Sequence, residues 1–257
     1  MRRTLFGNCW TAHTPLMLSL SIAVMVFSAC TLAPLQEPVP VAGAFPELKP
    51  PENGQKSWWA CRFQIHWPAD EPPDFTVDLL LAHAVVGPVL KAHSRDIDWW
   101  RFHRRAARDA AGHRFSFLFY TEPAVAAEIF AAISGSRILQ ETLDADWVVS
   151  VDTDDPSKSH QRDIEALSDS NWSPAMQRNW PYFIMGVSSL WLALIDDLTG
   201  SKSDADPEMD LTARMEAYRA VASELNAIWY EEGQHALLHH LNAIFGYEPI
   251  RIRKNLR

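Results

Sequence analysis

Alternation of apolar and polar side chains predicts four strands in the first two thirds of the sequence. Between Trp58 and Trp67 the odd-numbered positions are apolar, a period of two that is typical of a half-buried strand ending at Pro68. Two aromatic-rich runs follow, and Gly112 closes the loop of residues 105–112 that joins them as a hairpin. The predicted strands cover residues 58–67, 97–104, 113–120 and 147–151.

Helical spacing separates these strands and dominates the rest of the sequence. Between residues 74 and 93 apolar positions recur at intervals of three and four, which predicts a helix that Gly87 and Pro88 should kink. The run from Ile250 to Arg253 alternates again and could add an edge strand. The other predicted helices cover residues 122–133, 159–168, 174–198 and 207–243.

The order strand, helix, strand, strand, helix, strand is that of the split βαβ arrangement. We therefore predict an α+β fold in which a ferredoxin-like split βαβ sheet is followed by a helical C-terminal part. The predicted domain covers residues 57–257, with the sheet in 57–155 and mainly helices in 156–257.

The first 29 residues have the pattern of an export signal. Two arginines precede an apolar run over residues 16–27, which is too short to span a bilayer stably. The run ends in Phe27-Ser28-Ala29-Cys30, which resembles the lipobox of bacterial lipoproteins. This resemblance implies cleavage after residue 29 and transfer of diacylglycerol to the Cys30 thiol, with palmitate as a further acyl chain on the same cysteine. The alternatives are an ordinary secretory signal, cleaved near residue 29 or 33, and an uncleaved anchor helix.

Prolines recur through residues 30–56, which predicts an extended tether between the lipid and the domain. No aspartate directly follows Cys30. In a Gram-negative cell the resemblance to lipoproteins then implies the outer membrane, with the domain facing the periplasm. Beyond the leader we expect no stretch that approaches the ~18–20 apolar residues of a membrane span. The acylated cysteine would then be the only firm attachment to the lipid bilayer.

Composition narrows the class of protein further. The 257 residues are 47% hydrophobic, which is enough for one sizeable core. Because 32 acidic residues oppose 23 Lys and Arg, for a formal net charge of −9, no nucleic-acid partner is expected. Cys61 is the one cysteine after position 30, and its apolar neighbours predict a buried thiol without a disulfide partner.

Four segments resemble the small C-terminal domain of lantibiotic and thiopeptide dehydratases. They are Trp59, Asp78-Leu79-Leu80, Trp99-Trp-Arg-Phe-His-Arg104 and Gly112-His-Arg-Phe-Ser-Phe117. That domain eliminates glutamate from a glutamylated peptide, so the resemblance implies Arg104 and His113 as anion binder and proton carrier. Ser116 and Phe117 stand where the family has basic residues. Dehydratases use cytoplasmic aminoacyl-tRNA, which an exported protein would not meet, so the resemblance supports the fold more than the activity.

Basic side chains gather on the polar face of the predicted sheet. If the strands pair as proposed, one face is aromatic, while arginines on the other could bind a carboxylate or a phosphate bidentately. A solvated or salt-bridged sheet face is the alternative. The candidates on this face for binding an anion or a peptide are Arg62, His66, Arg101, His103 and Arg114.

The last predicted helix carries a weaker pattern. Glu232, His235 and His239 lie on one helical face, a spacing from which side chains could hold a metal ion. Further ligands are not evident, so a polar helix face is the preferred interpretation, and no metal or cofactor is predicted. The patterns typical of hydrolases, nucleotide-binding loops and thiol-redox sites are absent from the sequence.

These observations predict an envelope lipoprotein that is not an enzyme and whose periplasmic domain is a binding or assembly module for a protein or peptide partner. The alternative is an enzyme that acts on an exported peptide by elimination or a related acid-base step. That alternative requires Arg104 and His113 to converge in one cleft.

Overall fold

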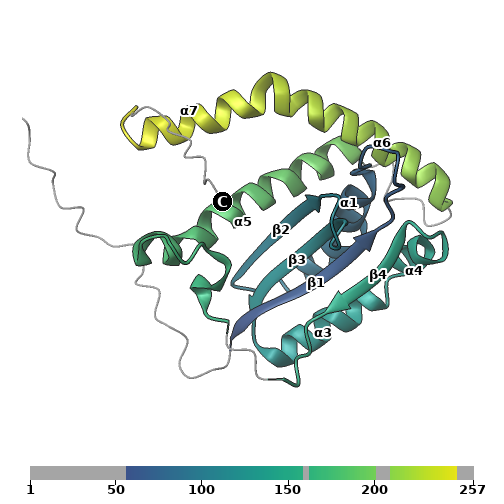
Figure 1. Ribbon diagram of the computed structural model, residues 1–257, viewed down its shortest axis with the longest axis horizontal. Helices are drawn as coiled ribbons and strands as arrows, with labels where there is room; N and C mark the ends of the chain where they lie inside the picture. The colour runs from purple at the N-terminus through teal and green to yellow at the C-terminus, as the bar shows by residue number, and fades with distance from the viewer. Residues whose placement is uncertain (1–55, 159–161, 201–208, 248–257) are drawn as a thin grey trace, which may run out of the picture. The chain divides into compact units, whose positions relative to one another are not determined.

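One antiparallel sheet organises the part of the chain that the computed structural model describes, which is residues 56–158, 162–200 and 209–247. Its strand order, β2-β3-β1-β4, with helices between β1 and β2 and between β3 and β4, is that of a ferredoxin-like split βαβ sheet. The predicted fold class is therefore confirmed (Figure 1). The strands are β1 (Ser57–Ile65), β2 (Trp99–Ala106), β3 (His113–Thr121) and β4 (Val148–Thr153).

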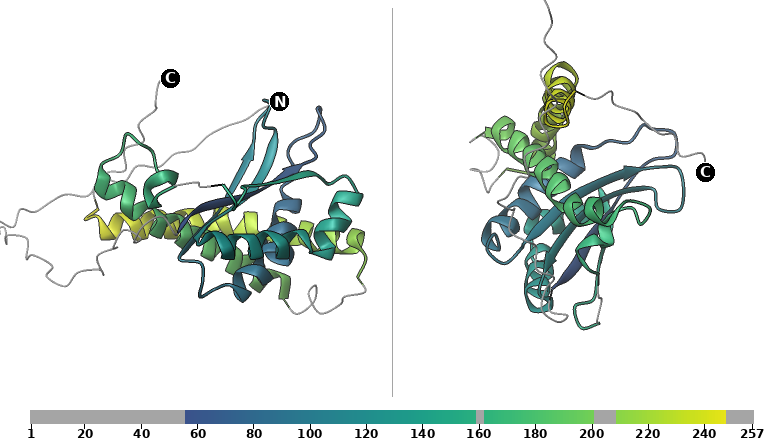
Figure 2. Two further views of the ribbon diagram at one scale, coloured as in Figure 1. Left: turned by 90° about the horizontal axis from the view of Figure 1, so that it is seen from below. Right: turned by 90° about the vertical axis from the view of Figure 1, so that its left-hand side faces the viewer.

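The helices of both crossovers pack on one face of the sheet (Figure 2). The first crossover is α1 (Thr76–Leu80), a π-helical stretch η1 (Leu81–Val86) and α2 (Gly87–Ala92). The kink predicted at Gly87 and Pro88 thus takes the form of a π-helical stretch just before them, because Pro88 has no N–H to continue the α-helical ladder.

The second crossover contains one predicted and one unpredicted helix. The predicted one is α3 (Pro123–Ser134), which ends at Gly135 as expected. The unpredicted α4 (Arg137–Asp144) follows at once, and the Ser136 side chain caps it by accepting a hydrogen bond from the Leu139 N–H.

The C-terminal part of the described chain is helical, as predicted. The expected helix at 159–168 is wrong, because its described residues form only a 3-10 turn, η2 (Ile164–Leu167). The predicted helix at 174–198 is α5 (Pro174–Thr199). The predicted helix at 207–243 consists of α6 (Leu211–Ile228), a π-helical stretch η4 (Trp229–Gly233) and α7 (Gln234–Ile244). The possible strand at 250–253, Cys30, the leader and the tether to residue 55 lie outside the described residues.

The core lies between the sheet and the crossover helices. Phe63, Phe115, Phe117 and Phe119 are fully buried on this face of the sheet, as the alternation predicted. Cys61 is also buried and forms no disulfide within the described residues, and burial raises the pKa of its thiol to about 12. A smaller cluster of Trp58, Trp99 and Tyr120 occupies one end of the opposite face, where η2 covers it.

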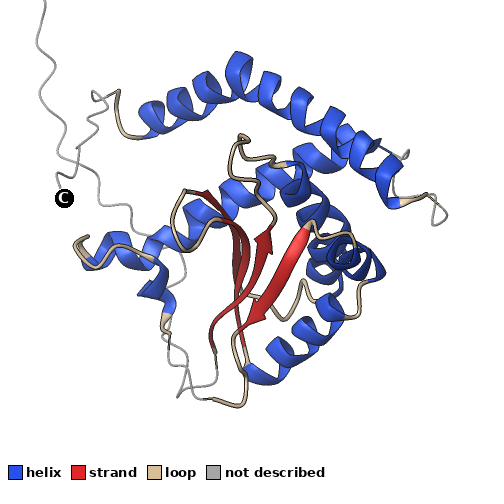
Figure 3. Ribbon diagram, turned by 45° about the vertical axis from the view of Figure 1, so that its right-hand side comes forward, coloured by secondary structure: helices blue, strands red, loops and turns tan. Residues whose placement is uncertain are grey.

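Helix α5 lies along the free edge of β2 (Figure 3). The Phe102 N–H, on that edge, donates a hydrogen bond to Ser188 Oγ at 3.1 Å, and Tyr182 contacts Trp99 edge-on. By length and composition α5 could span a membrane, since its most apolar window has a mean hydropathy of 1.3. The expectation that no segment beyond the leader approaches such a length is therefore wrong.

Candidate functional site

The open face of the sheet holds a basic hollow. Arg101, His103 and Arg105 alternate along β2, and β3 adds Arg114 beside them, while the register aligns His103 with Ser116 and Ser116 with Arg62 on β1. The hollow has a volume of about 320 Å³. Its lining residues are Arg62, Arg101, His103, Arg105, Arg114, Ser116 and Leu118.

Four of the five residues predicted for this face thus meet in one place. The hollow also contains Arg105, which sequence reasoning assigned to the hairpin loop because the strand was expected to end at residue 104, two residues before the end of β2. Arg105 is odd-numbered, like Arg101 and His103, so alternation along the strand places all three on one face. This pattern could have identified Arg105 from the sequence.

The cations of the hollow differ in how they are neutralised. Arg62 forms ion pairs with Asp154 at 2.9 Å and with Asp152 at 3.2 Å, and Arg105 pairs with Asp109 beyond the strand. Arg101, His103 and Arg114 form no ion pair with a carboxylate in the described part of the chain. The hollow therefore carries positive charge that no described acid neutralises.

Two of these side chains are perturbed by their surroundings. Burial lowers the pKa of Arg101, and its Nε atom is buried without a hydrogen-bond partner among the described residues. Burial also lowers the pKa of His103, with smaller contributions from the charges of Arg101 and Arg105. An anion in the hollow would reverse both effects, because it would favour the charged forms and accept hydrogen bonds from unused donors.

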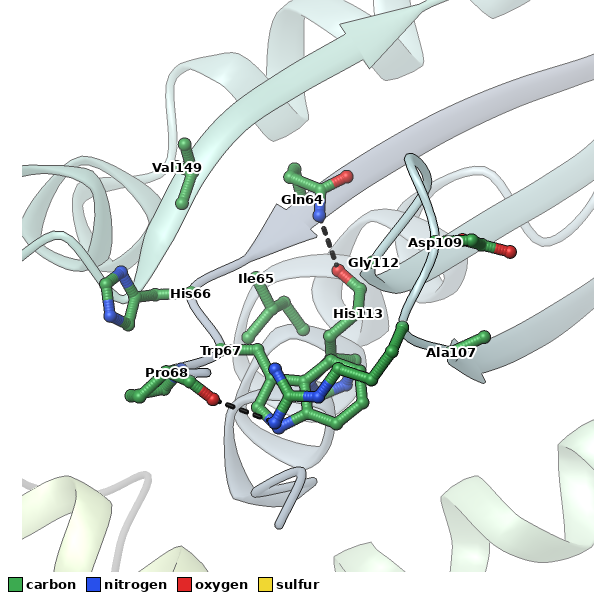
Figure 4. Close-up of a pocket in the computed structure, with 11 residues that line it drawn as sticks. Gln64, Ile65, His66, Trp67, Pro68, Ala107, Asp109, Gly112, His113 and Val149 are labelled. Carbon is green, nitrogen blue, oxygen red and sulfur yellow. Dashed lines mark hydrogen bonds between the residues drawn. The ribbon is translucent and has the colours of Figure 1, made fainter. Parts of the chain in front are cut away.

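His66 lies apart from the basic hollow. Strand β1 ends at Ile65, after a register shift against β4 between Gln64 and Ile65, so the alternation does not carry as far as His66. His66 instead lines a second hollow, of about 550 Å³, between the segment after β1 and the β2–β3 hairpin (Figure 4). Gln64 donates a hydrogen bond from its Nε2 to the His113 carbonyl at one side of it.

Arg104 and His113 lie on the core side of the sheet, opposite the basic hollow. Both approach one carboxylate, that of Asp78 on α1: His113 Nε2 is 3.1 Å and Arg104 Nε is 3.6 Å from Asp78 Oδ2. The two residues therefore meet at one carboxylate, whereas the enzymatic alternative requires them to meet in a cleft. The second hollow is lined by His113 but not by Arg104. However, the side chains of His113 and Asp78 are both 0% exposed, so the anion that meets Arg104 is internal.

Sequence reasoning did not assign Asp78 a role, because only the folded sheet brings it to His113. Aromatic rings enclose the cluster: Phe75 and Trp67 meet the His113 ring edge-on, and the Arg104 guanidinium lies 4.5 Å from the centre of the Phe75 ring. This arrangement neutralises a buried charge. His113 also lines the second hollow, although its side chain is 0% exposed.

The histidines of α7 do not form a metal site in the described residues. The rings of His235 and His239 stack with their centres 5.6 Å apart, and Glu232 lies in the π-helical stretch before them. No group of three His, Cys, Asp or Glu side chains in the described ranges is close enough to hold a metal ion.

Comparisons with known proteins add little to this picture. No protein-family model and no curated protein matches the sequence. A solved structure described as "Crystal structure of TsrL" is similar over 73% of this chain and 55% of that chain, with 13% sequence identity and a TM-score of 0.33. This chain spans about half the length of that protein. A similarity this low supports no conclusion about function, and the fold class depends on the strand order alone.

Proposed function

We propose that this chain is a lipoprotein of the cell envelope whose exported domain binds an anionic group of a protein or peptide partner in the basic hollow. The unneutralised charge of Arg101 and Arg114 carries this proposal. Arginine donors in a fixed fork match a carboxylate or a phosphate, and a partly buried position strengthens such bonds. The alternative is a solvated or salt-bridged face. Salt bridges account for Arg62 and Arg105 but not for Arg101 and Arg114, which have no ion-pair partner among the described residues, and a solvated face is the competing interpretation of those two.

The binding proposal is tested with a fluorescent peptide of six glutamates and the double variant Arg101→Gln, Arg114→Gln. Each lost charged hydrogen bond costs about 1.5–3 kcal/mol, so the variant should bind at least tenfold more weakly. The matched control, Lys91→Gln with Arg95→Gln, removes the same charge from exposed positions away from the hollow and should bind nearly as well as the parent protein. Equal loss in the two double variants would mean that the peptide senses only net charge, and the hollow would not be its site.

The anchoring part of the proposal depends on the sequence of the leader, and it is tested separately. Protein expressed in a Gram-negative host should partition into detergent and carry the mass of its acyl chains, whereas Cys30→Ala should do neither. Full-length Cys30 protein that keeps its leader and stays in the cell interior would contradict this part. The peptide-binding result would stand in either case.

Acid-base catalysis by Arg104 and His113 is the alternative function, favoured by their approach to one carboxylate and opposed by the burial of the His113 side chain. It predicts that His113→Gln abolishes a reaction on an exported peptide without unfolding the domain. A purely structural cluster predicts the opposite, which is a loss of stability without any lost reaction.

A further inference from the structure

A hydroxyl group lies at the centre of the basic hollow. In the register of the sheet, His103 on β2 is opposite Ser116 on β3, and Ser116 is opposite Arg62 on β1. Ser116 is the least exposed of the residues that line the hollow, at 7%. Its hydroxyl forms no hydrogen bond with any residue that the structure describes. A small side chain with an unused donor therefore forms the floor of the hollow, between two basic side chains.

Two arginines flank this central row from opposite sides. Arg101 precedes His103 by two residues on β2, and Arg114 precedes Ser116 by two residues on the antiparallel strand β3. Each arginine is thus about 7 Å of strand away from the row, a distance that an extended arginine side chain can cover. The two guanidinium groups can therefore reach one ligand above Ser116 from two directions.

Carboxylates neutralise the margins of the hollow but not its middle. On the β4 side, Arg62 pairs with Asp152, which lies opposite it in the register, and with Asp154. At the hairpin end, Arg105 pairs with Asp109. The two flanking arginines have no such partner among the described residues. An anion is therefore favoured over β2 and β3, away from the acids of β4.

The number of charges and donors favours one class of anion. A carboxylate brings one negative charge and two oxygens, whereas a phosphate monoester brings about −1.5 to −2 charges near pH 7 and three free oxygens. Two unneutralised guanidinium groups balance the charge of the phosphate, and a third oxygen remains for the Ser116 hydroxyl. A carboxylate would leave one positive charge unbalanced in a partly buried place.

We infer that the anion bound in the basic hollow is a phosphate monoester dianion, held by Arg101, Arg114 and the hydroxyl of Ser116. The inference rests on the proposed function, because it names the chemical class of the anionic group that the partner would present. The same chemistry could come from a phosphorylated side chain of the partner or from free inorganic phosphate, and the test distinguishes these sources. A carboxylate is the competing ligand.

The charge of the ligand is tested with three fluorescent peptides that differ only in a central phosphotyrosine, sulfotyrosine or glutamate. The two esters share a tetrahedral shape and three free oxygens, but the sulfate ester carries a single negative charge. Slightly above neutral pH, the phosphotyrosine peptide should bind about tenfold more tightly than the other two, the equivalent of one charged hydrogen bond. Below about pH 6 the phosphate takes up a proton, so its advantage over sulfotyrosine should shrink.

Matched variants test whether the hollow makes this distinction. In the double variant at positions 101 and 114 the two esters should bind nearly equally, whereas the control double variant at positions 91 and 95 should keep the difference. Ser116→Ala should weaken binding of the phosphotyrosine peptide about tenfold, because a hydrogen bond to a charged oxygen is lost. Ser150→Ala is the control, since Ser150 is exposed on the same face of the sheet but does not line the hollow.

Competition by inorganic phosphate identifies the source of the ligand. Displacement of the phosphotyrosine peptide at phosphate concentrations near the peptide's own Kd would assign the hollow to the free ion. Displacement only at much higher concentrations would assign it to a phosphorylated partner. Equal affinity for the three peptides, or a phosphotyrosine advantage that survives in the double variant of the hollow, would overturn the inference. Glutamate-peptide binding that this variant loses would then still support the proposed function, whereas binding of every peptide that does not depend on the hollow would overturn both.

Discussion

At the scale of single residues, the carboxylate of Asp78 is the buried charge that most needs partners. It is completely buried, and its described ion-pair partners are His113 and Arg104. A buried charge that keeps its partners is tolerated, whereas one that loses a partner is strongly destabilising. The sequence singled out Arg104 and His113 only through a family resemblance, and it could not show that both would approach the same helix residue on the core side.

Replacing His113 with leucine should therefore cost about 3–5 kcal/mol of unfolding free energy, since the Asp78 charge keeps only Arg104. Urea denaturation followed by tryptophan fluorescence measures this cost. His66→Leu is the control, because His66 is exposed and its loss should change stability by less than about 0.5 kcal/mol. Similar costs for both variants would show that the cluster does not hold Asp78 as a charged group.

His103 should make anion binding depend on pH. Its pKa is below the usual 6.5 in the free protein, because burial and the charges of Arg101 and Arg105 disfavour the imidazolium. A bound anion favours the imidazolium, so binding takes up a proton and affinity rises as the pH falls through the pKa of the complex. The rise is about tenfold for each unit by which the anion raises that pKa. Glutamate-peptide titrations between neutral and mildly acidic pH should show this rise, and His103→Gln should remove most of it.

At the scale of elements, the pattern of the sequence identified each of the four strands and most helices in the described residues, because a period of two or of about 3.6 is visible without the fold. The π-helical stretch before Pro88 and the short helix α4 were not predicted. The first departs from α-helical spacing, and the second depends on a cap at Ser136 only one residue after Gly135 ends α3. The position of the strand end also affects the site, since β2 continues two residues beyond the predicted end and so brings Arg105 into the hollow.

One side-chain hydroxyl, that of Ser188, forms a hydrogen bond between α5 and the edge of β2. Ser188 accepts from the Phe102 N–H and donates to the Ile184 carbonyl, whereas the exposed Ser189 only donates to Met185. Ser188→Ala leaves a part-buried N–H unpaired and should cost about 1–3 kcal/mol. Ser189→Ala, one position along, is the matched control and should cost much less. Hydrogen exchange at Phe102 should accelerate only in the Ser188 variant, and equal exchange in both would show that water pairs this N–H instead.

At the scale of the whole molecule, the fold class could be predicted because the order of elements along the chain leaves few ways to pair four strands. The positions of the C-terminal helices could not, since they depend on side-chain contacts that periodicity does not encode. His83, on η1, is an example: its Nδ1 lies 2.7 Å from the Tyr218 hydroxyl on α6 and its Nε2 lies 3.1 Å from Asp196 on α5. Three segments far apart in the sequence thus meet at one imidazole.

The buried thiol of Cys61 can report how often the sheet opens. It lies in the middle of β1, paired to β3 on one side and β4 on the other, and its thiol has a pKa of about 12. Only the thiolate reacts with alkylating reagents, so modification must wait until β1 separates from its neighbours. In the Cys9→Ser, Cys30→Ser background, the alkylation rate should therefore follow the equilibrium of global unfolding as urea is raised. A much faster rate would reveal that the centre of the sheet opens without the rest of the domain.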